Sequence, residues 1–191
     1  MVAARAAAGR FAFVVVAGLG LGIVVGGVIG RLLMYLLVRL NDQARGLVSD
    51  DGFVMGQFTV SGSLSLLGVG AFLGTWGGLV YAGARHLTFG PAWFQMTSVA
   101  LGAGLPVGAA IVHTEGVDFT VLTPPALSAT LFVLLPASYG VLHRLVVERQ
   151  IAAAPTSWHR LEPVRWLLRA GATGVLVIAL TDLVGDLWVL T

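Results

Sequence analysis

The sequence contains no cysteine and no lysine, and only 10% of its 191 residues are charged, against about 25% in an ordinary soluble domain. The absence of cysteine excludes disulfide bonds, thiol catalysis and thiolate metal sites. All eleven cationic side chains are arginines, the formal net charge is only +2, and the sequence has no basic stripe of the kind that nucleic-acid binding requires. We therefore expect no nucleic-acid partner.

Hydrophobic residues make up 57% of the sequence, more apolar surface than a soluble fold of this length can hide. Apolar runs of roughly 20 residues are long enough to cross a hydrocarbon core about 30 Å thick. Five such runs occur, at residues 11–30 or somewhat beyond, 61–84, 93–112, 124–143 and 164–182. The first is longer than the apolar region of a signal peptide and is expected to be a retained span. The sequence predicts an all-α integral membrane protein, a bundle of about five transmembrane helices in a single domain over residues 1–191.

Arginine gathers on one side of this predicted bundle. Arginine and lysine collect in short cytoplasmic loops, and eight of the eleven arginines precede the first span, follow the second or surround the connection between the fourth and fifth: Arg5, Arg10, Arg85, Arg144, Arg149, Arg160, Arg165 and Arg169. This distribution predicts the N-terminus inside and the C-terminus outside. The expected location is the cell membrane, as a multi-pass protein of a bacterial inner membrane with the lipid bilayer around it.

Two of the spans carry glycine at every fourth position. The first has Gly18, Gly22, Gly26 and Gly30, and the second has Gly70, Gly74 and Gly78. In lipid there is little hydrophobic force between helices, so small residues four apart favour association by letting two backbones approach closely. We expect these two spans to pack tightly, against each other or across a subunit boundary. The sharper alternative is a glycine zipper that lines a pore.

Arg31 follows the first glycine strip directly. It comes twenty residues after Phe11, and at about 1.5 Å per residue this places it at the outer edge of the hydrocarbon. Asp182 comes eighteen residues after Val164 on a span that runs in the same direction, at a similar depth. A charge at that depth requires a partner or water, so we predict an ion pair between Arg31 and Asp182 or Asp186, which share a helix face. The alternative is that Arg31 reaches the lipid headgroups without a partner.

The segment "HTEGVDF" brings His113, Glu115 and Asp118 together just after the third span. Imidazole and carboxylate groups at this spacing can hold a divalent metal or relay a proton. The competing interpretation is a solvated loop whose acids cap helix ends. His86 and His143 lie beside arginines at inner helix ends, where we expect both to face headgroups.

Pro106 and Pro136 interrupt the third and fourth spans. Each proline removes a backbone donor and frees a carbonyl. With three glycines near Pro106, the third span is either a discontinuous helix of the kind that lines transporter sites or a kinked packing helix.

Enzyme signatures are absent. The sequence has no Gly-x-Ser-x-Gly elbow, no His-Glu-x-x-His, no phosphate-binding loop and no dinucleotide-binding glycine motif after a strand. We expect no catalytic residues, no cofactor and no enzymatic activity.

The Gly-rich first span ending in "GRLLM", the following "SDDGF" and the "HTEGVDF" before a Pro-Pro span together resemble small multi-spanning membrane proteins of actinobacteria that have no characterised activity. The resemblance covers residues 18–145. Abundant Ala, Gly, Val and Arg without lysine is typical of a high-GC genome and agrees with it. The resemblance implies a membrane helical bundle and assigns no role to any residue.

Two functions of different classes remain. The first is a non-enzymatic bundle that acts as a subunit or scaffold of a membrane complex, as a homo-oligomer or with another membrane protein. The second is a small oligomeric transporter or channel for a cation or proton, with an acidic outer vestibule. A transporter should place the hydroxyl groups of Thr97, Ser98, Ser128, Thr130 and Ser138 around one wet cavity, whereas a scaffold should bury them in hydrogen bonds between helices. A metal-dependent membrane enzyme is a third, less favoured, interpretation.

Overall fold

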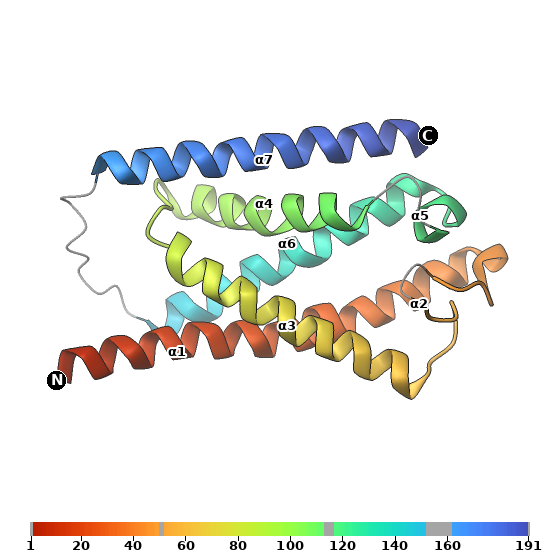
Figure 1. Cartoon of the computed structure of the whole chain (residues 1–191), viewed down its shortest axis with the longest axis horizontal. Coiled ribbons are helices and arrows are strands. Elements are labelled where there is room, and N and C mark those ends of the chain that lie inside the picture. The colour runs from red at the N-terminus through yellow and green to blue at the C-terminus, as the bar shows by residue number, and fades with distance from the viewer. Residues whose placement is uncertain (1, 50–51, 113–116, 152–161, 191) are drawn as a thin grey trace.

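The computed structural model describes residues 2–49, 52–112, 117–151 and 162–190. Over these residues the regular elements are helices, apart from one isolated bridge between Val48 and Val54. In chain order they are α1 (Val2–Gly22), the π-helix η1 (Ile23–Ile29), α2 (Gly30–Leu40), the short η2 (Asp42–Ala44), α3 (Val60–Ala84), α4 (Ala92–Ile111), α5 (Val117–Val121), α6 (Pro125–Gln150) and α7 (Glu162–Leu190). Figure 1 shows the long helices as one bundle, with α7 along one edge and α1 along the other.

Five helical segments in the described part of the chain are long and apolar enough to cross a membrane. They are Ala4–Leu40, Val60–Ala84, Ala92–Ile111, Pro125–Gln150 and Glu162–Val189. The all-helical fold with five span-length apolar helices is therefore confirmed. The first, fourth and fifth continue several residues beyond the predicted runs. The two ends of the chain lie at opposite ends of the bundle (Figure 1).

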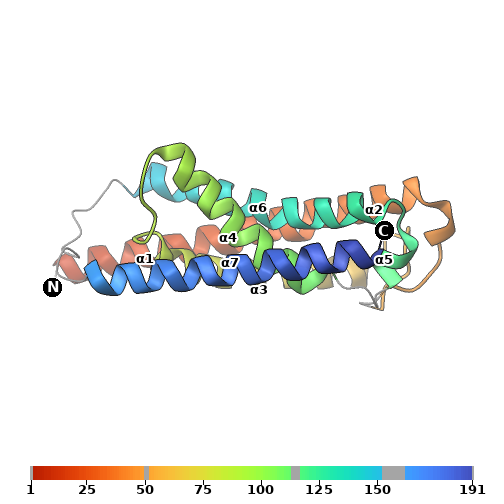
Figure 2. The same cartoon turned by 90° about the horizontal axis from the view of Figure 1, so that it is seen from above.

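The first of these segments is one long helix whose middle is π-helical. Seven residues, Ile23–Ile29, hydrogen-bond from residue i to i+5 between α1 and α2. The resulting helix runs along the whole molecule, as Figure 2 shows. It ends at Asn41, whose backbone is no longer helical.

Between η2 and α3 the described residues, 45–49 and 52–58, form a tight excursion, called here the 45–58 excursion. Gly46, Gly52 and Gly56 have φ angles of 87°, 78° and 79°, which other residues rarely adopt. The excursion ends at Thr59, whose hydroxyl oxygen accepts a hydrogen bond of 3.2 Å from the backbone N–H of Gly62. This N-cap satisfies one of the donors that the first turn of α3 would otherwise leave unpaired.

α7 is attached to the bundle mainly through α4, and also through α6. At its N-terminal end, Arg169 donates to the carbonyl of Leu87 at 2.9 Å, and its guanidinium lies 4.5 Å from the centre of the Phe89 ring. Arg165 donates to the carbonyl of His86 at 3.3 Å. Two arginines thus fasten the start of α7 to the short connection between α3 and α4. Burial, and then the charge of Arg85, lower the pKa of His86 in this connection.

The buried apolar side chains form three small clusters rather than one core. The first joins α4, α5, α6 and α7 through residues that include Leu105, Phe119, Ala129 and Leu183. The second lies where α2 ends, and the third lies where α1, α3 and α6 meet. Many large apolar side chains face outward, such as Trp76 at 55% exposure and Leu167 at 73%. Exposed apolar side chains are favourable in the hydrocarbon core of a membrane. The backbone polar groups there must be hydrogen-bonded internally, as they are in helices.

Candidate functional site

α1 and η1 cross α3 with their backbones in direct contact. A Cβ atom added at Gly18 would lie 2.5 Å from the carbonyl oxygen of Gly74 and 2.9 Å from the Cα atom of Gly78. At Gly70, an added Cβ atom would lie 2.5 Å from the carbonyl oxygen of Gly22. Side chains are therefore excluded here, and the two helices touch backbone to backbone. This is the kind of contact that the glycine spacing predicts.

The π-helix changes which glycines take part in this crossing. A Cβ atom at Gly26 would lie 3.2 Å from the Cα atom of Gly70, and one at Gly27 would lie 3.0 Å from the Cα atom of Leu67. Gly30, the last glycine of the predicted strip, is turned to α6 instead, where an added Cβ atom would meet Leu135 at 3.3 Å. A strict spacing of four overlooks Gly27, because the wider π turn advances less than 100° per residue.

Tyr139 of α6 inserts its hydroxyl group into the crossing. Its oxygen donates to the carbonyl of Gly74 at 2.8 Å. A Cβ atom at Gly77 would lie only 2.7 Å from that hydroxyl oxygen, and one at Gly18 would lie 3.0 Å from it. The glycines therefore also create the space for a tyrosine that ties a third helix to the pair.

His143, one turn further along α6, is buried rather than directed to headgroups. Its side chain is only 1% exposed, and Nε2 lies 2.9 Å from the carbonyl oxygen of Val14 in α1. A carbonyl can only accept, so Nε2 must carry the proton. The ring stacks on Tyr139 with 5.5 Å between centroids and meets the edge of Tyr81 at 5.0 Å. The expectation that His143 faces lipid headgroups is wrong, because three helices meet around this position.

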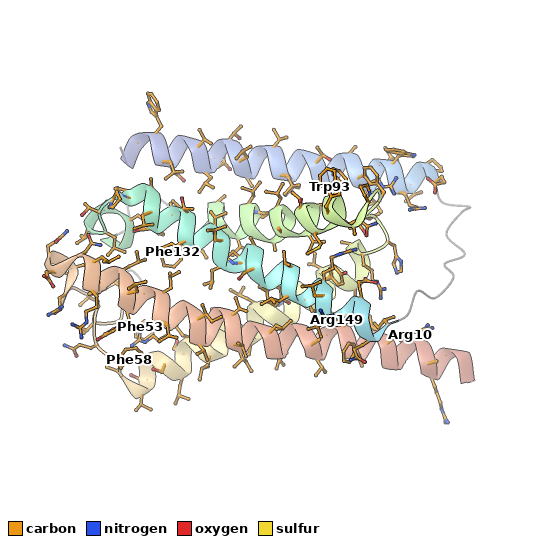
Figure 3. The ribbon with its side chains drawn as sticks, turned by 180° about the vertical axis from the view of Figure 1, so that it is seen from behind. Arg10, Phe53, Phe58, Trp93, Phe132 and Arg149 are labelled. Carbon is orange, nitrogen blue, oxygen red and sulfur yellow. The ribbon has the colours of Figure 1, made fainter. Side chains whose placement is uncertain are left out.

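A short polar chain leads from this histidine toward the end of α6. Tyr81 donates from its hydroxyl to Glu148 at 2.9 Å, and Arg85 forms an ion pair with the same carboxylate at 3.2 Å. Arg144 donates to the side chain of Gln95 in α4 at 2.6 Å. Together with His143 these residues connect four helices at one end of the molecule, the end where Figure 3 places Arg10, Arg149 and Trp93. We call the set of His143, Tyr139, Tyr81, Glu148 and Arg85 the polar network.

A second glycine crossing joins α4 to α6. A Cβ atom at Gly104 would lie 3.0 Å from the carbonyl oxygen of Val133, one at Gly108 would lie 2.5 Å from the Val133 side chain, and one at Gly140 would lie 2.9 Å from Ala103. The glycines around Pro106 left two interpretations of this span open, a discontinuous helix and a kinked packing helix. The structure has α4 as one continuous helix through Pro106. The spacing of four between Gly104 and Gly108 is the signal that could have identified this crossing.

The predicted ion pair of Arg31 does not form. Arg31 instead donates to the backbone carbonyl of Gln57 at 2.6 Å, and its guanidinium lies 5.3 Å from the centre of the Phe58 ring. The ion pairs among the described residues join other groups, and neither Asp182 nor Asp186 takes part in one. The physical reason is the arrangement of the bundle: α2 packs near α3 and α6, whereas α7 lies along the opposite edge (Figure 1).

The predicted cluster after the third span falls mostly outside the described part of the chain. His113 and Glu115 lie there, and Asp118 belongs to α5 but its side chain is also outside it. Among the described residues, no group of three or more His, Asp or Glu side chains is placed to hold a metal ion.

A cavity of about 30 Å³, room for one or two water molecules, lies between α2 and the 45–58 excursion. Its lining includes Arg31, Tyr35, Phe53, Phe58 and Phe132. Figure 3 shows the three phenylalanines at the same end of the molecule, far from Arg10 and Arg149. None of the five hydroxyl residues that a transporter should gather lines this cavity.

Four of those five hydroxyl groups instead bond within their own helices. Thr97, Ser98, Thr130 and Ser138 donate to the carbonyls of Trp93, Phe94, Ala126 and Leu135 at 3.0, 2.8, 2.6 and 2.7 Å. Ser128 is buried, with 1% exposure. Neither prediction is met as stated, because the bonds are neither around a wet cavity nor between helices.

Asn41 closes the opposite end of the bundle from the polar network. Its side chain is 2% exposed and donates to the carbonyl of Leu37 at 2.9 Å. Its Oδ1 atom accepts from the backbone N–H of Thr123 at 2.7 Å and from the Thr123 hydroxyl at 2.8 Å. One amide thus joins the end of α2 to the turn before α6. The Thr123 hydroxyl serves this contact and does not cap the helix.

No protein-family model matches the chain, and comparisons with curated proteins and with solved structures give no match.

Proposed function

We propose that this protein is a non-enzymatic, multi-pass helical bundle of the cell membrane that acts as a subunit or scaffold in a membrane complex. The single observation that carries this proposal is the backbone-to-backbone crossing of α1 and η1 with α3, where added Cβ atoms at Gly22 and Gly74 would overlap the facing helix. Such a contact fixes two helices rigidly and leaves no space between them. The sequence offers no catalytic motif that competes with this interpretation.

The intramembrane hydroxyl groups support the same proposal. A permeation path through the bundle requires polar groups directed at a shared, water-filled space. Thr97, Ser98, Thr130 and Ser138 satisfy their hydroxyls on their own helix carbonyls. These hydroxyl groups therefore need no water as a hydrogen-bond partner. They fit a rigid packed bundle better than a water-filled permeation path.

The proposal also includes an orientation and a glycine zipper. The N-terminal end of the bundle carries the polar network, the arginines at the start of α7 and Arg10, so we place this end in the cytoplasm by the rule that arginine and lysine concentrate there. The zipper is formed by Gly18, Gly22, Gly70 and Gly74, and it holds α1 against α3 within one chain rather than lining a pore.

The test is purification from native membranes in mild detergent, followed by native mass spectrometry. A different polypeptide retained in fixed stoichiometry, or a defined oligomer of this chain without transport activity, is the expected result. Specific ion or proton flux into proteoliposomes containing the purified protein would contradict the proposal.

The second candidate is transport of a cation or proton. It is favoured by one observation, the buried and ionisable His143 in the middle of a polar network within α6. Ionisable groups inside a span are commonly parts of proton relays. The acidic vestibule of this candidate consists of His113, Glu115, Asp118, Asp182 and Asp186. If flux exists and survives substitution of both Glu115 and Asp118, the vestibule has no role in it.

A further inference from the structure

Asp182 is an exposed carboxylate on the apolar surface of α7. The helix carries Trp166 near its start and Trp188 near its end, 59% and 83% exposed, and indole rings favour the two membrane interfaces. Twenty-two residues separate them, about 33 Å along a helix, which matches the hydrocarbon thickness. Asp182 lies six residues before Trp188, about 9 Å inside that boundary.

A carboxylate at this depth needs a partner. Long arginine and lysine side chains can extend to the interface from such a position, but the single methylene group of aspartate cannot span this distance. Asp182 makes no hydrogen bond and no ion pair with the residues that the structure describes. One turn earlier on α7 lies the apolar Ile178, at 61% exposure, and one turn later lies Asp186, which carries the same charge.

Arg31, half-buried beside the cavity, carries the complementary charge on the long first helix, which lies along the other edge of the bundle. In the described structure its contacts are neutral, the Gln57 carbonyl and the Phe58 ring. A guanidinium has five N–H donors, and the bond to Gln57 uses one. Val28, one turn earlier on the same long helix, is 46% exposed and apolar.

The two charges lie in the second half of helices that run in the same direction. α1 and α7 both start at the end of the bundle that holds the N-terminus (Figure 1). Arg31 comes twenty residues after Phe11, and Asp182 comes eighteen residues after Val164. Two copies standing side by side in one membrane therefore carry these charges toward the same face of the membrane, where the long Arg31 side chain can extend toward Asp182.

We infer that the flank of α7 around Asp182 in one copy packs on the long first helix around Arg31 in a second copy, with an ion pair between Arg31 and Asp182 across the contact. This inference rests on the proposed function and names the partner, a second copy of the chain. The two surfaces are different and lie on opposite edges of each bundle, so the contact is heterologous. Repetition of such a contact closes a ring or builds an open row in the membrane.

Cysteine cross-linking tests this contact directly, because the natural chain has no cysteine. Two differently tagged full-length copies are co-expressed, one with Val28→Cys and the other with Ile178→Cys, and membranes are oxidised. The expected product is a heterodimer joined by a disulfide, which requires Cα atoms within about 7 Å. The matched control replaces Ile178→Cys by Val184→Cys, an equally exposed position at 56% on the other flank of α7, and its yield should be at least tenfold lower.

The charge pair is tested in the same assay. Asp182→Asn should reduce the cross-link at least fivefold, whereas Asp186→Asn should change it less than twofold. Asp182→Arg in the Ile178→Cys copy, combined with Arg31→Glu in the Val28→Cys copy, should restore the yield. An undiminished cross-link with Asp182→Asn overturns the ion pair.

Other products overturn the assignment of the occupant. A link between two Ile178→Cys copies indicates a symmetric α7 contact, and a link from Ile178→Cys to a different polypeptide indicates a foreign helix on this surface. A heterologous partner found by native mass spectrometry without the Val28–Ile178 cross-link leaves the proposed function standing and refutes this inference. Ion flux together with the cross-link refutes the proposed function and leaves the contact standing.

Discussion

Gly22 and Gly74 lie back to back at the centre of the bundle: a Cβ atom added to either residue would lie 2.6 Å from the Cα atom of the other. An added side chain on either helix would therefore meet the backbone of the other helix, which cannot move aside locally. A flexible side chain could rotate away from an added methyl group, whereas a helix backbone can only separate from its partner.

The first prediction concerns this contact. Gly74→Ala should lower the free energy of unfolding in detergent by about 2 kcal/mol, the usual cost of overpacking a tight interior. Gly83→Ala is the matched control on the same helix, since nothing lies within 4 Å of its added Cβ atom. The control should leave stability unchanged or raise it, because alanine favours helix over glycine. Equal losses in the two variants would show that the crossing is looser than described.

His143 provides the second prediction. His143→Phe keeps a ring between Tyr81 and Tyr139 but removes the donor to the Val14 carbonyl. Hydrogen bonds between helices in membranes contribute about 0.6 kcal/mol on average, so the variant should lose about that much stability in a denaturant titration. His143→Ala removes the ring as well and should cost several times more. A Phe variant as unstable as the Ala variant would contradict the assignment of the ring to packing.

A third prediction tests the junction of Tyr81 and Glu148. Tyr81→Phe and Glu148→Gln are made singly and together, and the free energy of unfolding is measured for each. Residues that share a hydrogen bond show coupling of about 0.5–3 kcal/mol in such a cycle, and we expect a value at the lower end because the Glu148 side chain is 35% exposed. Strict additivity would mean that the 2.9 Å bond between them contributes nothing.

The fourth prediction is that Asn41 is the most sensitive polar residue at its end of the molecule. Asn41→Ala removes a buried amide and leaves the N–H of Thr123 and the carbonyl of Leu37 without that partner, which should cost about 1–3 kcal/mol of stability. Asn41→Asp can still accept from Thr123 but can no longer donate to Leu37, so it should also destabilise. Gln43 donates to the same Asn41 and Thr123 oxygens, but from an exposed side chain and at 3.3 and 3.4 Å, so Gln43→Ala is the comparison and should change stability by less than about 0.5 kcal/mol. Thermal unfolding in detergent distinguishes the three.

A fifth prediction follows from the lowered pKa of His86. With the folded-state pKa below the ordinary value of about 6.5, the unfolded chain takes up a proton first as the pH falls. The free energy of unfolding should therefore decrease as the pH falls below that ordinary value, and the decrease should be smaller in His86→Gln. Measurements at pH 8 and pH 5.5 on both proteins are sufficient. A steeper decrease in the variant would reverse the sign of the assigned shift.

The spans and the glycine strips could be predicted because each depends on a regular local pattern. Apolar length identifies a helix that can cross a membrane, and Gly18, Gly22, Gly70 and Gly74 follow a spacing that places them on one helix face. The helical extensions to Leu40 and Leu190 are harder to predict. A helix can continue beyond an apolar run when no helix-breaking residue follows the run.

The partners of charged and polar side chains could not be predicted in the same way. Arg31 and Asp182 satisfy depth and direction, but their distance depends on which helices are neighbours, and sequence spacing says nothing about neighbours. His143 was misjudged because Arg144 beside it points to a helix end, whereas its own face is covered by α1 and α3. Gly27 was missed because its participation depends on a π turn that no residue type announces.

That π turn, Ile23–Ile29, holds one more residue than an α-helix of the same rise would need. The long first helix is therefore tolerant of a change in length at one place along its course. Removing one residue there restores ordinary winding and leaves the contact faces on both sides in phase, while the same deletion elsewhere in α1 or α2 rotates everything beyond it by about 100°. The π segment therefore sets the rotation between the two parts of the helix. It aligns the glycine face before it with α3 and the surface after it with α6.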